Sequence, residues 1–217
     1  MKSKKALYVF LVGLALVGIC IRLKTGISTA YSKDVNGGLK AFLVYRLNDK
    51  LCGSKFSVDI FLNPIGYVLM IAGMKNLQEM NKKIKVAIGF SVIGLLVSLV
   101  RMFVPLLVSK GTLLIKITVV AYVLEGICMI IIISRFVELV KSKVDSYYNM
   151  EVGKDLGYAM ELFGFSYFAL IIIIFAEAIG LYFAGLLLIL DYVIVIYSVL
   201  YFIYKTNRYN NELKFFE

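Results

Sequence analysis

The chain has 217 residues, of which 61% are hydrophobic, and a mean hydropathy of +0.87. A water-soluble fold of this size cannot bury so much apolar surface, so the composition argues against a soluble domain and predicts a membrane protein. The net charge of +10 would fit a nucleic-acid partner, but most Lys and Arg residues lie between apolar runs, where lipid headgroups account for them. We therefore expect the lipid bilayer, and no nucleic acid, as the partner. Histidine is absent, which excludes an imidazole base and a His-ligated metal.

The first apolar run covers residues 6–21 and follows three lysines, the layout of a signal peptide or of a membrane anchor. Basic residues follow the run at once, and the nearest small-residue cleavage pattern, Ser28-Thr29-Ala30, lies well beyond its end. We expect the run to be retained as a first helix.

Residues 22–57 form a long polar and strongly basic segment. Within it, apolar side chains recur at helical spacing after the turn signal Asn36-Gly37-Gly38. These apolar residues are Leu39, Phe42, Leu43, Leu47 and Leu51. The pattern predicts a short amphipathic helix over about residues 37–51 that lies on the membrane surface.

Five further apolar runs are each long enough for one membrane crossing by an α-helix. Residues 135–157 separate two of these runs and are expected to form a mixed-charge linker, while the turn at Gly180 to Gly185 divides the last long run. Asn63-Pro64 falls early in the first of the five and predicts a broken helix there, since proline lacks a backbone donor. Together with the run at residues 6–21, they give six expected helices. We therefore expect the whole chain, residues 1–217, to be one all-α transmembrane domain. The five further runs are 58–74, 86–108, 113–134, 160–182 and 186–204.

Basic residues near helix ends predict the orientation in the membrane. With both termini in the cytoplasm, most of these residues lie on the inner side, and the first loop is the exception. We predict a multi-pass cell-membrane protein with cytoplasmic N- and C-termini.

Four charged residues interrupt the apolar runs: Arg101, Glu125, Glu177 and Asp191. Each costs roughly 2.5 to 3.5 kcal/mol at a helix centre, so such residues normally face protein or water. At a rise of about 1.5 Å per residue from the expected inner end of each helix, Arg101, Glu177 and Asp191 lie at a similar depth in the membrane. Glu125 lies closer to the inner side. The levels favour an ion pair of Arg101 with Glu177 or Asp191. Lys116 falls near the outer surface, where its amino group can reach water.

Helical faces support an inward cluster of these charges. Ser91, Gly94, Ser98 and Arg101 fall on one stripe of small and polar residues, and Asp191 and Ser198 lie one heptad apart. The pattern predicts that the last four helices pack closely around a polar centre.

The four charges suggest a site for a small cationic or polar ligand, because two or three carboxylates outnumber one guanidinium. The structural alternative is that the charges pair only with one another, or with a partner subunit or second copy. No catalytic motif, metal-ligand cluster or cofactor-binding loop is recognisable, so nothing requires an enzyme.

Three functions are therefore left open. The first is a transporter or solute-binding membrane subunit, with the basic first loop as an outer lid. The second is a non-catalytic assembly, regulatory or effector subunit, and the third is a lipid-acting enzyme that uses Glu125 or Asp191. In size and helix count the chain is similar to the substrate-binding subunits of energy-coupling-factor vitamin transporters, without a shared motif. That similarity implies a partner complex, since the chain has no nucleotide-binding elements.

Overall fold

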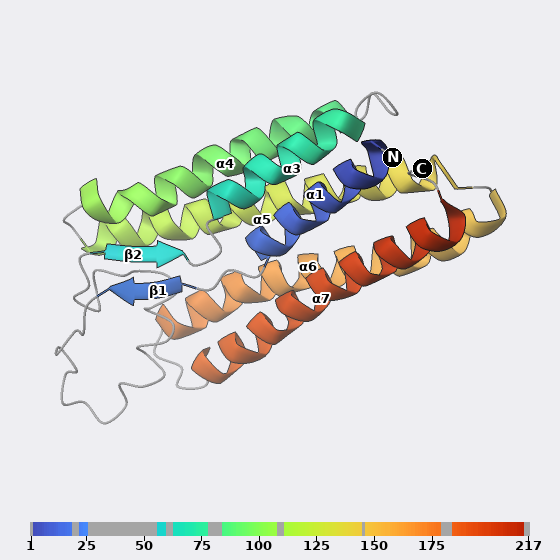
Figure 1. The fold of residues 1–217 in the computed structure, drawn as a ribbon. Helices are drawn as coiled ribbons and strands as arrows, with labels where there is room; N and C mark the ends of the chain where they lie inside the picture. The colour runs from blue at the N-terminus through green and yellow to red at the C-terminus, as the bar shows by residue number, and fades with distance from the viewer. Residues whose placement is uncertain are drawn as a thin grey trace.

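The computed structural model describes residues 2–18, 22–25, 56–59, 63–77, 84–107, 111–144, 146–178 and 184–214. These residues form six α-helices and one small sheet (Figure 1). The helices are α1 (Lys2–Gly18), α3 (Asn63–Leu77), α4 (Ile84–Leu107), α5 (Gly111–Lys141), α6 (Ser146–Ala178) and α7 (Ala184–Leu213). The predicted all-α character is confirmed for the bulk of the fold. The predicted surface helix over 37–51 lies outside the described residues.

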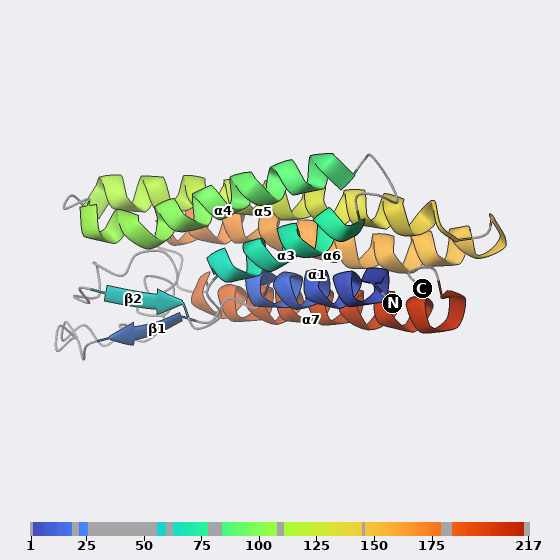
Figure 2. The ribbon, with the colours of Figure 1, turned by 45° about the horizontal axis from the view of Figure 1, so that its top comes forward.

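A two-stranded antiparallel sheet, which the sequence did not predict, joins β1 (Arg22–Thr25) to β2 (Phe56–Asp59). Arg22 lies opposite Asp59 in its register. The strands lie at one end of the helical bundle, and α1 begins and α7 ends at the other (Figures 1 and 2). We call these the sheet end and the termini end.

The helices run up and down, and each contacts the next along the chain. The contact of α1 with α7 closes the bundle. α1 ends and α3 begins part-way along the bundle, whereas α4 to α7 extend further toward the sheet end (Figure 2).

Glycines allow α1 and α3 to pack backbone against backbone. A Cβ atom added at Gly13 would lie 2.5 Å from the carbonyl oxygen of Gly66, and one added at Gly73 would lie 2.7 Å from the backbone nitrogen of Phe10. Gly66 and Gly73 are one heptad apart and therefore share one face of α3. Side chains larger than hydrogen at these points would separate the two helices.

The predicted break at Asn63-Pro64 is wrong, because the helix begins there. Residues 56–59 belong to β2, and α3 runs from Asn63. Proline is favoured in the first turn of a helix, where its missing N–H has no partner in any case, and asparagine is favoured at the start. The dipeptide therefore starts α3 rather than interrupting it.

The predicted linker over 135–157 is also wrong, because α5 continues to Lys141 and α6 begins at Ser146. Buried apolar residues continue at helical spacing through this region, including Phe136, Val140 and Leu156. Charged residues such as Lys141, Glu151 and Lys154 occupy exposed positions on the two helices. Charge alone does not end a helix that extends beyond an apolar run.

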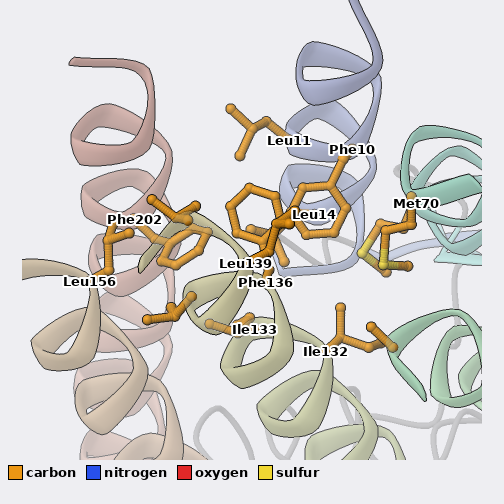
Figure 3. Close-up of a cluster of buried hydrophobic side chains, with 14 of the residues drawn as sticks. Phe10, Leu11, Leu14, Met70, Ile132, Ile133, Phe136, Leu139, Leu156 and Phe202 are labelled. Atoms are coloured by element: carbon orange, nitrogen blue, oxygen red, sulfur yellow. The ribbon is translucent and has the colours of Figure 1, made fainter. Parts of the chain in front are cut away.

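An aromatic layer lies at the centre of the core, where α1, α5 and α7 meet (Figure 3). Phe10 stacks on Phe136 with ring centroids 4.4 Å apart, and the edge of Phe202 meets Phe136 at 5.9 Å. All three side chains are fully buried. The layer joins the first helix of the chain to the last.

By length and composition, one of the described helices can cross a membrane, over Ile84–Phe103. Only 28% of that stretch is buried within the bundle. The expected number of six crossings stays a prediction.

Candidate functional site

Arg101 of α4 and Glu125 of α5 form an ion pair inside the bundle. Their side chains are each 3% exposed. Ser91 and Ser98 are buried on the same face of α4 as Arg101, as the stripe of small and polar residues predicted. A guanidinium and a carboxylate this deeply buried neutralise each other, which offsets much of the cost of taking either charge out of water.

The sequence favoured Glu177 or Asp191 as the partner of Arg101, and the structure shows an ion pair with Glu125. A pairing with Glu177 stays a prediction, because that side chain lies outside the described part of the structure. The rise per residue along a helix places Cα atoms and not the ends of side chains. Side chains on a helix lean toward its N-terminus, and α4 and α5 run in opposite directions. The side chains of Arg101 and Glu125 therefore lean toward each other, and their charged groups meet although their Cα atoms lie at different heights.

Asp191 of α7 is the second buried acid of the site, at 3% exposure. The hydroxyl of Ser166 on α6 donates a hydrogen bond to Asp191 Oδ1 over 2.5 Å and lies 3.3 Å from the Asp191 carbonyl oxygen. Ser166 is itself fully buried. The two residues place a carboxylate and a hydroxyl at the interface of α6 and α7.

Close contacts between helices place Arg101 and Asp191 at a similar height in the bundle. Arg101 follows Gly94 by seven residues and Asp191 precedes Val199 by eight, so each lies about 10 to 12 Å nearer the sheet end than those contacts. Both charges therefore lie beyond the C-terminus of α1. The contacts that align the helices are Gly18 with Val199, Val17 with Gly66, and Tyr67 with Gly94.

Glu177 and Lys116 also lie in helices. Glu177 is in the last turn of α6, and Lys116 is near the start of α5. Their side chains are outside the described part of the structure, so the expected role of Glu177 stays a prediction.

The chemistry available at this height of the bundle is that of a carboxylate with a hydroxyl between α6 and α7, and of an ion pair between α4 and α5. Within the described residues, no group of three or more His, Cys, Asp or Glu side chains could hold a metal ion. The Asp191 carboxylate can accept a proton or attract a cation, and the Ser166 hydroxyl can orient either one.

A second polar cluster, which the sequence did not predict, lies nearer the termini end between α6 and α7. Asp155 Oδ2 accepts hydrogen bonds from Lys205 Nζ at 2.5 Å and from the Tyr209 hydroxyl at 2.6 Å. The Lys205 ammonium also lies 5.5 Å from the ring centre of Tyr201. We call Asp155, Lys205 and Tyr209 the Asp155 cluster.

Asp155 and Lys205 of the Asp155 cluster are ionised at neutral pH. Burial alone would raise the pKa of the Asp155 carboxyl, but the hydrogen bonds from Lys205 and Tyr209 and the Lys205 charge outweigh it and lower that pKa. The hydrogen bond to Asp155 raises the pKa of Lys205, although burial opposes the rise. Burial, followed by the hydrogen bond to Asp155, raises the pKa of Tyr209, so its hydroxyl keeps its proton and donates.

A faint sequence signal for this cluster exists. Lys205 and Tyr209 are four residues apart and share one helical face, and that face continues the apolar stripe of α7. Asp155 lies 50 residues away from Lys205. One sequence gives no means of bringing it to that face.

Comparison with known proteins finds no family model that matches the chain, and no curated protein or solved structure that is significantly similar to it. The function must therefore be inferred from the chemistry of the chain itself.

Proposed function

We propose that this protein is a multi-pass membrane protein that binds a small cationic solute, or a proton, at Asp191 among α4 to α7. Its six helices cross the bilayer, and Ser166 and Asp191 form the binding position. The buried Arg101–Glu125 pair fixes α4 against α5 beside that position.

The inverted polarity of α4 is the observation that carries the membrane part of the proposal. The face of α4 inside the bundle carries Ser91, Ser98 and Arg101, whereas its outer face carries Leu96 and Val100, which are 56% and 50% exposed. A helix in water places polar residues outside and apolar residues inside. Hydrocarbon favours the reverse, with lipid against the apolar face and the charge directed at protein.

Every helix of the bundle exposes large apolar side chains in the same way. A soluble monomer rarely exposes apolar patches beyond a few hundred square ångströms. Six examples, one from each helix and each more than half exposed, are Val12, Val68, Leu96, Val120, Phe168 and Leu190. An apolar surface on all the helices favours surrounding lipid over a single docked partner.

The solute part of the proposal depends on the buried carboxylate of Asp191. An acid inside a membrane bundle is costly, so it normally serves an ion or solute or pairs with another group. The Ser166 hydroxyl donates a hydrogen bond to Asp191 Oδ1 and is placed to orient an ion or solute bound there. A cation or a proton at Asp191 would lower the cost of its charge.

Exposed basic residues favour a cytoplasmic location for the termini end. By the directions of their helices, these residues lie toward that end: Lys5, Lys75, Lys85, Lys141, Lys143, Lys154, Arg208 and Lys214. Basic residues are enriched on the cytoplasmic side of membrane proteins. Arg22 and Lys24 in β1, and Lys116 near the start of α5, lie toward the sheet end and do not follow this pattern.

Two measurements test the proposal. We expect the purified chain to require detergent and to float with liposomes in a density gradient, and a detergent-free soluble monomer would contradict the membrane part. We also expect native mass spectrometry of the solubilised protein to detect a retained small solute that Asp191→Asn loses.

Glu161→Gln is the matched control, because Glu161 is an exposed acid on α6. It should retain the solute with its thermal stability unchanged. Equal retention by Asp191→Asn would refute the site. Loss of a co-purified protein subunit in Asp191→Asn, with no solute in the wild type, would favour the assembly-subunit alternative.

A further inference from the structure

The path along α7 from Asp191 toward the termini end meets two successive obstacles. The buried stripe of α7 continues from Asp191 through Val195 and Ser198 to Phe202. Phe202 belongs to the aromatic layer, in which side chains from α1, α5 and α7 touch (Figure 3). The first obstacle is thus a packed apolar layer that leaves an ion no polar ligand.

The second obstacle is the Asp155 cluster, about one turn of α7 beyond Phe202. Lys205 and Tyr209 of α7 both hold the carboxylate of Asp155 on α6. The Lys205 and Asp155 side chains are 17% and 23% exposed, so water reaches the cluster. The cluster therefore lies where the protein interior meets the solvent at the termini end.

The Arg101–Glu125 pair and the Lys205–Asp155 pair differ in exposure, and therefore in the cost of opening them. Breaking the fully buried Arg101–Glu125 pair would leave two charges in the interior without water, which is strongly unfavourable. Water can solvate Lys205 and Asp155 when they separate, so opening this pair costs much less free energy. Of the two pairs, only the second can open and close in normal operation.

We infer that the Asp155 cluster is a gate that closes the termini end over the Asp191 site. This inference rests on the proposed function. With Asp155 bound to Lys205 and Tyr209, the ends of α6 and α7 are held together and the aromatic layer stays packed. Release of Asp155 lets the two helix ends separate, and water then reaches the stretch of α7 between Phe202 and Asp191.

Accessibility of a single cysteine at position 198 tests the gate. Ser198 is 1% exposed and lies between Asp191 and Phe202 on the buried face of α7. Ser198→Cys is introduced after Cys20, Cys52 and Cys128 have been replaced by alanine. The full-length protein is reconstituted in liposomes, and a membrane-impermeant maleimide is added from the termini side.

We expect slow labelling with the gate intact and faster labelling in Asp155→Asn and in Lys205→Met. The expected increase is roughly fivefold, the change in open population that about 1 kcal/mol produces. Arg208→Gln is the matched control, because it breaks the Arg208–Glu212 pair on the exposed side of the same helix. It should leave the labelling rate unchanged.

The double variant Asp155→Lys with Lys205→Asp keeps an ion pair with its charges exchanged and should restore slow labelling. Fast labelling with the gate intact, or equal rates in all variants, would overturn the gate. Neither result depends on a solute. A protein that floats with liposomes and loses its solute in Asp191→Asn, but labels equally in all variants, would refute the gate alone and leave the proposed function standing.

Discussion

Three of the ion pairs formed by the described residues differ mainly in exposure, and exposure determines their contribution to folding. Arg101 and Glu125 are fully buried, Lys205 and Asp155 are partly exposed, and Arg208 and Glu212 are each about half exposed. An exposed pair stabilises little because water and salt screen it. A buried pair depends on both partners, since either charge alone is strongly destabilising.

Removal of one buried partner should therefore cost much more than removal of both. We expect Arg101→Leu to reduce the free energy of unfolding by about 3 to 5 kcal/mol, because the Glu125 carboxylate loses its guanidinium in an apolar interior. The double variant Arg101→Leu with Glu125→Leu should recover most of this loss. Unfolding of the detergent-solubilised protein measures both effects. A double variant as unstable as the single one would contradict the prediction.

The Asp155 cluster should contribute to stability across the neutral range and weaken at both extremes of pH. The pKa of Asp155 is lowered on folding, so its contribution is complete above its ordinary value of 3.8 and declines as pH falls through the folded value. The pKa of Lys205 is raised, so its contribution is complete below 10.5 and declines as pH rises through the folded value. The difference in melting temperature between wild type and an Asp155→Asn, Lys205→Met double variant measures this. A melting-temperature difference that changes steadily between pH 6 and 8 would argue against the assignment.

At the scale of helices, apolar periodicity predicted where elements exist better than where they end. Apolar residues at positions such as Phe136 and Leu156 continue the helical pattern into the charged region that was expected to be a linker. The sheet was missed because Arg22–Thr25 carries no alternating apolar pattern and its partner strand lies more than 30 residues away.

At the candidate site, the sequence identified Arg101, Glu125 and Asp191 as charges in apolar runs, and all three are buried. It could not identify their partners. Pairing depends on the direction in which side chains lean and on contacts between distant segments, such as Ser166 with Asp191. Periodicity within one helix contains neither kind of information.

Close packing of α1 against α3 should make its glycines intolerant of even one methyl group. Gly73→Ala places a carbon within 3 Å of backbone atoms of α1, which cannot move aside cheaply. We expect a loss of about 1 to 3 kcal/mol in the free energy of unfolding, the usual cost of overpacking. Gly89→Ala is the control, since nothing lies within 4 Å of its added carbon, and it should be neutral or stabilising by up to about 1 kcal/mol. Equal effects of the two variants on detergent unfolding would show that α1 and α3 are not packed this closely.

At the scale of the whole molecule, apolar side chains occupy both the centre and the perimeter. Phe163 and Phe165 illustrate this on α6, where the first is 1% exposed and the second 62% exposed. In water the two positions would differ sharply in their preference for phenylalanine. Under the proposed membrane location that difference disappears, because the perimeter would then meet hydrocarbon.

Fluorescence quenching can distinguish lipid from water at this perimeter. The chain contains no tryptophan, so Phe165→Trp and Phe163→Trp each provide a single emitter without background. If Phe165 faces acyl chains, brominated phospholipids in the liposome should strongly quench Phe165→Trp and only weakly quench Phe163→Trp, which the bundle covers. Acrylamide added to the water should quench neither strongly. The reverse result at position 165, with acrylamide effective and brominated lipid ineffective, would place α6 in water and remove the physical basis for six membrane-crossing helices.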